Sequence, residues 1–157
     1  MSSPADRGQR GKIAEAVVMQ TLKKFADRHH CFTFNRVQDA RTAGGRGTAA
    51  IGDFQAFYSG QGKGSRNFVI EVKEVAHAYR LSYNNFDAGQ IARMRIRELA
   101  GSIALVLVYH SPTKLWRILP LSLFYTREEG AGSWDLSQTE QTAALALELD
   151  KRLFHDS

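Results

Sequence analysis

Alternating apolar and polar positions predict a buried strand in the middle of the chain, over residues 67–75. Glu71 and Lys73 share one side of this strand with Val69, and the other side carries Phe68, Ile70 and Val72. An acid and a base among such strand-forming residues are costly to bury unless something compensates their charges. The segment therefore indicates a functional site as well as a strand.

A second apolar-rich run, Asp53–Tyr58, precedes this strand, and a glycine-rich loop over residues 59–66 joins the two. Runs connected in this way are typical of an antiparallel hairpin with a long connection. The hairpin would bring Asp53 close to Glu71. Two carboxylates at one point are able to hold a hard divalent cation through oxygen, with Lys73 beside them for a phosphate oxygen or an attacking water.

Further periodic segments predict helices and strands on both sides of this hairpin. Helices are expected over residues 12–28, 87–99 and 139–154, and strands over residues 31–36, 102–109 and 114–119. The run at 102–109 is apolar on both faces, as in an inner strand of a sheet. The predicted fold is α/β, with a central mixed β-sheet flanked by helices.

Two of the helices carry more detailed expectations. The helix over 87–99 would be capped by Asn84 or Asn85 and turn three apolar side chains inward, those of Ile91, Met94 and Leu99. Ser137 and Glu140 have the spacing of a capping box that opens the last helix. That helix would bury one stripe of leucines, Leu145, Leu149 and Leu153.

The length of 157 residues suits a single domain, and 43% hydrophobic residues suits a water-soluble globule. The chain has one cysteine and no apolar run long enough to cross a bilayer, which favours a cytoplasmic protein. Within the domain, residues 1–9 are expected to be flexible, 38–50 to form a basic glycine-rich loop, and 128–157 to form a C-terminal helical extension.

The formal net charge of +5 is concentrated in the first third of the chain, which favours binding to a polyanion. A charged surface tuned for solubility explains the charge alone equally well. Glu15 is a second ambiguous feature, because it falls inside the apolar arc of the helix over 12–28. It either faces a cation or basic partner, or it is a rim residue favoured by the helix dipole.

Asp53 followed by Glu71-x-Lys73 resembles the signature of the PD-(D/E)xK nuclease superfamily. Three further segments resemble RecU-type Holliday junction resolvases of that superfamily, in the same order along the chain. They are Arg10-Gly-Lys-x-x-Glu15, then Leu81-x-x-Asn-Asn-Phe86 with Gln90, Ile91 and Met94, and finally the apolar strand at 103–108 with Trp116-Arg-Ile-Leu-Pro120. The resemblance covers about residues 10–124 and implies a restriction-endonuclease-like nuclease core.

The chain departs from that family in three places. The insertion that protrudes as a stalk in the family is shortened here to roughly residues 34–50, Gly89 stands where the family tends to have His, and the spacing from Asp53 to Glu71 is longer than usual. The residues from Glu128 onward have no evident counterpart. The shorter stalk bears on how a junction would be held more than on the chemistry.

The resemblance implies a role for each residue of the site. Asp53 and Glu71 would be metal ligands, with Glu15 as a further ligand directly or through water. Lys73 would orient water and stabilise the phosphorane charge, and Gln90 would touch the same water or a phosphate. Mg²⁺ suits these carboxylates, with Mn²⁺ as a substitute.

The implied activity is Mg²⁺-dependent, structure-selective endonucleolytic cleavage of DNA, resolving four-way (Holliday) junctions by paired nicks from a homodimer. Residues expected to contact DNA are Arg7, Arg10, Lys12, Arg36, Arg41, Arg46, Lys63, Arg66 and Asn85. Alternatives are a monomeric nuclease of the same fold acting on DNA ends or flaps, a catalytically silent nucleic-acid binder, and a basic domain that binds proteins.

Overall fold

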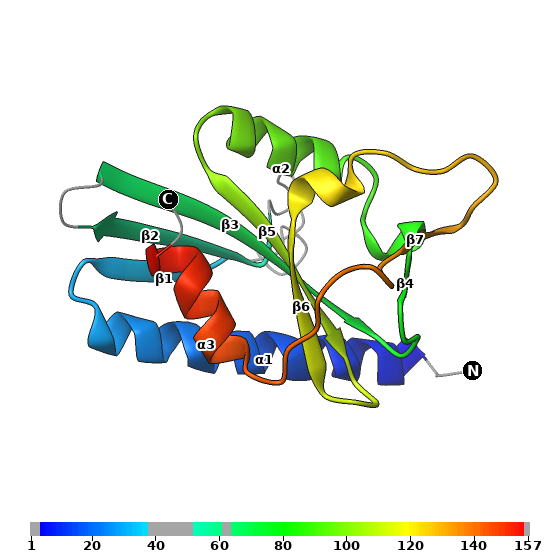
Figure 1. Cartoon of the computed structure of the whole chain (residues 1–157), viewed down its shortest axis with the longest axis horizontal. Helices are drawn as coiled ribbons and strands as arrows, with labels where there is room; N and C mark the ends of the chain where they lie inside the picture. Colours follow the sequence, from blue (N-terminus) through cyan, green and yellow to red (C-terminus); the bar gives the residue numbers. More distant parts are fainter. Residues whose placement is uncertain (1–3, 38–51, 61–63, 156–157) are drawn as a thin grey trace.

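A five-stranded mixed sheet forms the centre of the molecule, with strand order β1-β2-β3-β5-β6 (Figure 1). The structure is a computed structural model that describes residues 4–37, 52–60 and 64–155, with side chains from Gly11 onward. The sheet strands are β1 (Phe32–Arg36), β2 (Phe54–Gly60), β3 (Gly64–Val75), β5 (Ile103–His110) and β6 (Leu115–Pro120). Only β3 and β5 pair in parallel; the other neighbours are antiparallel.

Helices cover both faces of this sheet, so the predicted fold class is confirmed (Figure 1). The helical elements are α1 (Pro4–Arg28), the short turn η1 (Tyr83–Asn85), α2 (Gln90–Leu99), the turn η2 (Leu121–Phe124), α3 (Leu145–Asp150) and the π-helical turn η3 (Lys151–His155). A separate two-stranded sheet pairs β4 (Arg80–Ser82) with β7 (Ser133–Asp135). No helix among the described residues is both long enough and apolar enough to span a membrane.

The two faces of the sheet pack into two separate hydrophobic cores. One core joins α1, α3 and η3 to the face of β3 that carries Phe68, Ile70 and Val72. The other joins α2, η2 and β7 to the face that carries Val69. β5 contributes to both cores, Leu105 to the first and Val106 to the second, as an inner strand must. The alternation in residues 67–75 therefore predicted the orientation of β3 correctly.

The N-terminal helix is longer than predicted. α1 begins at Pro4, inside the segment 1–9 that we expected to be flexible. Proline suits the first turn of a helix because its missing N–H would have no partner there. The expected loop over residues 38–50 lies outside the described residues.

Helix α2 differs in two ways from the helix predicted over residues 87–99. α2 begins at Gln90 with Gly89 as its N-cap, while the side chain of Ser82 caps the short turn η1 that holds Asn84 and Asn85. Met94 is buried as expected, but Leu99 is 79% exposed. Five residues after Met94 the side chain lies roughly 140° further round the helix, away from the sheet.

The C-terminal segment is helical only from Leu145 onward, so the capping box prediction was wrong. The N–H of Ser137 bonds to the Asp135 carboxylate in a turn after β7. Thr142 then forms an isolated bridge with Trp116 of β6, which keeps this part of the chain extended. The leucine stripe was predicted correctly, because Leu145, Leu149 and Leu153 are all buried in the first core.

Candidate active site

The hairpin of β2 and β3 brings Asp53 opposite Glu71. The two strands pair antiparallel with Phe54 facing Ile70, so the next position places Asp53 across from Glu71 on the same face. The backbone N–H of Asp53 donates to the Ile70 carbonyl at 2.8 Å. The backbone N–H of Val72 donates to Oδ2 of Asp53 at 2.7 Å. These bonds lie on either side of Glu71 in sequence and fix the Asp53 carboxylate beside it.

Gly52 makes this approach possible. Its φ is +75°, a conformation that residues with a side chain rarely adopt. A Cβ built on Gly52 would lie 2.7 Å from Cγ1 of Val69 and 3.1 Å from the Ile70 carbonyl oxygen. A glycine is therefore required where the chain enters β2 immediately before Asp53.

Lys73 completes the group two positions further along β3. Its Nζ lies 3.0 Å from Oε1 of Glu71, and the two side chains are only 15% and 5% exposed. The second oxygen of Glu71, Oε2, is buried and has no hydrogen-bond partner. An unsatisfied carboxylate oxygen at such depth is unfavourable unless a ligand or cation completes it.

The electrostatics of Asp53 reflect this crowding. Burial, then the neighbouring Glu71 charge and a hydrogen bond with the Glu71 side chain raise the pKa of Asp53 from 3.8 to about 7, and the Val72 N–H and Lys73 only partly oppose the rise. Asp53 therefore keeps its proton to a higher pH than an exposed aspartate does. A cation bound between the two carboxylates would remove the repulsion and favour the charged form.

Glu15 approaches the group from α1 but is held by Arg36. Nη2 of Arg36 in β1 donates to Oε2 of Glu15 at 2.7 Å. Burial and then the Asp53 charge raise the pKa of Glu15, while Arg36 lowers it. Glu15 is therefore near enough to interact with Asp53, although its close partner is Arg36. Sequence reasoning did not anticipate this pairing for Arg36, which it assigned to DNA.

Gln90 is buried at the first position of α2. Its Oε1 accepts a hydrogen bond from the backbone N–H of Asp87 at 3.3 Å, which ties the side chain to the start of its own helix. Its role at a water or phosphate stays a prediction.

The residues expected to contact DNA are only partly described. Lys12 is exposed on α1. Arg66 donates from Nη1 to the Leu153 carbonyl at 3.4 Å, and Asn85 donates from Nδ2 to the Ser82 carbonyl at 3.1 Å. The side chains of Arg7, Arg10, Arg41, Arg46 and Lys63 lie outside the described part of the chain.

A metal site in this group would rest mainly on two carboxylates. In residues 4–37, 52–60 and 64–155, no group of three or more His, Cys, Asp or Glu side chains is placed to hold a metal ion together. Mg²⁺ is commonly bound by one or two protein carboxylates together with water and substrate phosphates. Asp53 and Glu71, with the unpartnered Oε2, fit that pattern.

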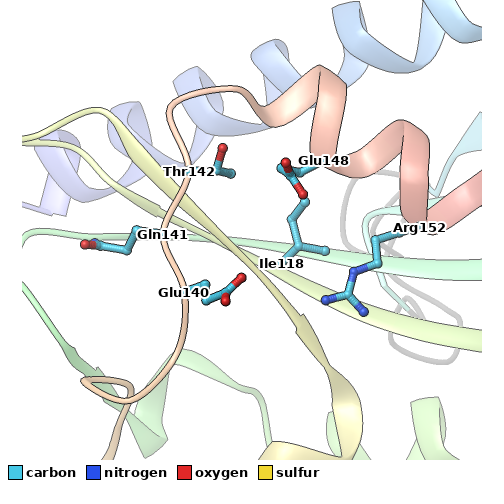
Figure 2. A pocket seen from close by; sticks show the side chains of 6 residues that line it. All are labelled: Ile118, Glu140, Gln141, Thr142, Glu148 and Arg152. Atoms are coloured by element: carbon cyan, nitrogen blue, oxygen red, sulfur yellow. The ribbon is translucent and has the colours of Figure 1, made fainter.

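A cavity of about 160 Å³ lies elsewhere, between β6, the segment 140–142 and the C-terminal helical residues. Figure 2 shows Glu140, Gln141 and Thr142 on the crossing segment, with Glu148 and Arg152 on the helical side. Ile118, which also lines it, packs against the core on the α1 face of the sheet. The cavity is therefore on the opposite face from Glu71 and Lys73.

Comparison with known proteins supports the fold. A scan against protein-family models finds no match, and a search of curated proteins finds none either. Among solved structures, the chain is similar to Archaeoglobus fulgidus Hjc, a Holliday junction resolvase from an archaeal hyperthermophile. The two are 22% identical with a TM-score of 0.50, and the match covers 87% of this chain and 99% of that one. At this identity the likeness shows a shared fold.

Proposed function

We propose that this protein is a metal-dependent, structure-selective DNA endonuclease that resolves four-way junctions. The observation that carries the proposal is the convergence of Asp53, Glu71 and Lys73 on one face of the sheet, with Oε2 of Glu71 buried and unpartnered. The fold shared with a Holliday junction resolvase supports the choice of substrate. The RecU-like motifs point to the same chemistry.

Asp53 and Glu71 would hold Mg²⁺, with Mn²⁺ as a substitute. The ion would polarise the scissile phosphate and lower the pKa of a bound water. Glu15 would join directly or through water, which requires it to loosen its bond to Arg36. This donor set is all oxygen, as hard divalent cations prefer.

Lys73 would stabilise the charge that develops on the phosphorus oxygens during attack by water. Phosphodiester hydrolysis passes through a pentavalent, doubly negative arrangement, and a fixed ammonium in a dry site stabilises it strongly. Glu71 would serve two purposes, since Oε1 holds the Lys73 ammonium while Oε2 is free of other bonds. Gln90 would orient the water or a phosphate oxygen.

The basic surface would hold the DNA mainly through phosphates, which selects shape more than sequence. A homodimer would place two sites against two opposing strands of a junction that is itself two-fold symmetric. The net charge of +5 supports phosphate contacts. Binding should therefore weaken steeply as salt is raised.

The test is cleavage of labelled four-way junctions, flaps and linear duplexes, each with Mg²⁺ and with EDTA. We expect paired nicks in the junction with Mg²⁺ only. Glu71→Gln should lower the cleavage rate at least about a thousandfold while junction binding is retained, because the substitution removes a metal ligand and the partner of Lys73.

Asp27→Asn is the matched control, since it also neutralises one carboxylate but at an exposed position near the end of α1. It should cleave at the wild-type rate. Cleavage of flaps or ends in preference to junctions would replace the resolvase proposal with an end- or flap-processing nuclease. Binding without cleavage in any ion would favour a silent nucleic-acid binder.

A further inference from the structure

The Lys73 ammonium has a second close neighbour besides Glu71. Its Nζ lies 4.8 Å from the centre of the Phe86 ring. Phe86 follows η1, in the connection between β4 and α2, and is 5% exposed. The ammonium is thus held between a carboxylate on its own strand and an aromatic ring from a different part of the chain.

The Phe86 ring is itself fixed by residues that come much later in the sequence. Trp134 of β7 meets it edge to face, with ring centres 5.5 Å apart and planes at 88°. Trp134 lies opposite Leu81 in the β4–β7 pair, and its Nε1 donates to the Thr126 carbonyl at 2.9 Å. The position of Phe86 therefore depends on the C-terminal segment.

We propose that Phe86 is a positioning residue for Lys73, and that Trp134 holds Phe86 in place. The inference rests on the proposed function, since it assumes that Lys73 acts on a phosphate. A ring face attracts a cation through its quadrupole, and the attraction grows when the cation is removed from water. Lys73 is 15% exposed, so the ring replaces part of the solvation that the ammonium loses on burial.

A purely structural role for Phe86 would require only apolar volume. The ring differs from an aliphatic side chain because it keeps the ammonium at one place while leaving its remaining N–H groups available to a phosphate. The ring is almost inaccessible, so it does not meet DNA. Altering its electron density should therefore change kcat and leave KM unchanged.

The decisive experiment replaces Phe86 with a series of phenylalanines that carry one to four ring fluorines. Fluorination weakens the cation–π attraction stepwise while the ring keeps nearly the same size. We expect kcat for junction cleavage to fall with each fluorine, by about tenfold over the series, because an interaction of this kind in a desolvated site is worth about one factor of ten in rate. The thermal midpoint should fall by only a few degrees, because the ring keeps its volume and only this one contact is weakened.

Phe86→Leu and Phe124→Leu form the matched pair. Both residues are buried in the same aromatic cluster, at 5% and 1% exposure, and their rings are 5.5 Å apart. Both variants should lose stability, but only Phe86→Leu should lose kcat at a temperature where both are folded. Equal losses of kcat in the two variants would overturn the inference, as would a fluorinated series with constant kcat.

A measurement without DNA separates this inference from the proposed function. In the folded protein, the ring current of Phe86 should shift the ε-methylene protons of Lys73 upfield, and Phe86→Leu should abolish that shift while Phe124→Leu retains it. An unshifted Lys73 overturns the contact. If wild-type protein cleaves no DNA under any condition, the proposed function fails, and with it the catalytic meaning of the contact.

Discussion

The two faces of β3 carry side chains of opposite character only one residue apart. On the α1 side, Phe68, Ile70 and Val72 pack into a continuous apolar core. On the α2 side, Val69 and Val75 are buried in the second core, and the charged pair Glu71 and Lys73 lies between them. The same backbone therefore supports a face that stabilises the fold and a face whose burial of charge is costly.

Apolar burial on one face of β3 offsets the free-energy cost of burying charged groups on the other. Apolar burial on one face contributes stability in proportion to the area removed from water. On the other face, a carboxylate whose pKa is raised to about 7 and a buried oxygen without a partner both oppose folding. Truncating an apolar side chain on the first face should therefore lower the free energy of unfolding, whereas neutralising a carboxylate on the second face should raise it.

The largest stability effect is expected on the apolar face. Ile70→Ala should lower the free energy of unfolding by about 3 kcal/mol, because Ile70 is fully buried and the change leaves a cavity. Urea denaturation followed by circular dichroism measures the loss. The cleavage rate per folded molecule should be unchanged at low temperature. A loss of activity as large as that of Glu71→Gln would mean that the two faces are not independent.

An effect of opposite sign is expected from Asp53→Asn. The folded-state pKa of Asp53 lies above its unfolded value, so the folded protein holds a proton that the unfolded chain releases. Wild-type stability should consequently fall as pH rises from about 4 to about 7, whereas the variant has no such group to titrate. At pH 8 in EDTA the variant should therefore be more stable than the wild type.

Thermal unfolding of both proteins between pH 3.5 and pH 8 provides the measurement, with Asp27→Asn as the control for a carboxylate at an exposed position. The two stability curves should approach each other as pH falls toward 3.5, because Asp53 then becomes protonated in the unfolded state as well as in the folded state. A wild-type protein that gains stability relative to Asp53→Asn as pH rises would contradict the raised pKa.

The smallest effect is expected at the rim, from Arg36→Gln. Arg36 is 54% exposed at its side chain and pairs with a partly exposed Glu15, so the pair should contribute less than about 1 kcal/mol. A double-mutant cycle with Glu15→Gln measures this coupling in urea. A coupling well above that value would show that the pair is part of the buried site.

Local patterns predicted the strands well because their register follows from burial. The alternation around Glu71, the hairpin that brings Asp53 to it and the two-sided burial of residues 104–108 all appear in the structure. Helix ends were less predictable because tertiary contacts decide them. Ser137 serves a turn with Asp135, and the bridge between Thr142 and Trp116 delays the last helix until Leu145.

The candidate site was predictable in part for the same reason. Asp53, Glu71 and Lys73 lie on one hairpin, so sequence spacing was enough to bring them together. The contact of Lys73 with Phe86 and the hydrogen bond of Arg36 to Glu15 join separate elements. Because the partners are far apart in sequence, no local sequence pattern predicts these contacts. The sequence indicated the requirement for Gly52 only weakly, because a glycine directly before a strand is common and does not by itself reveal a close approach of the backbone.

The short hairpin also favours an order of folding. Asp53 and Glu71 are 18 residues apart in sequence, so the loop between them closes early and at small entropic cost. Trp134 lies 61 residues after Lys73, and the strand that carries it must reach back across the molecule. We therefore expect the acidic pair to form before Trp134 fixes Phe86 against the Lys73 ammonium, and a chain arrested during synthesis before Trp134 would carry the two acids without that aromatic support.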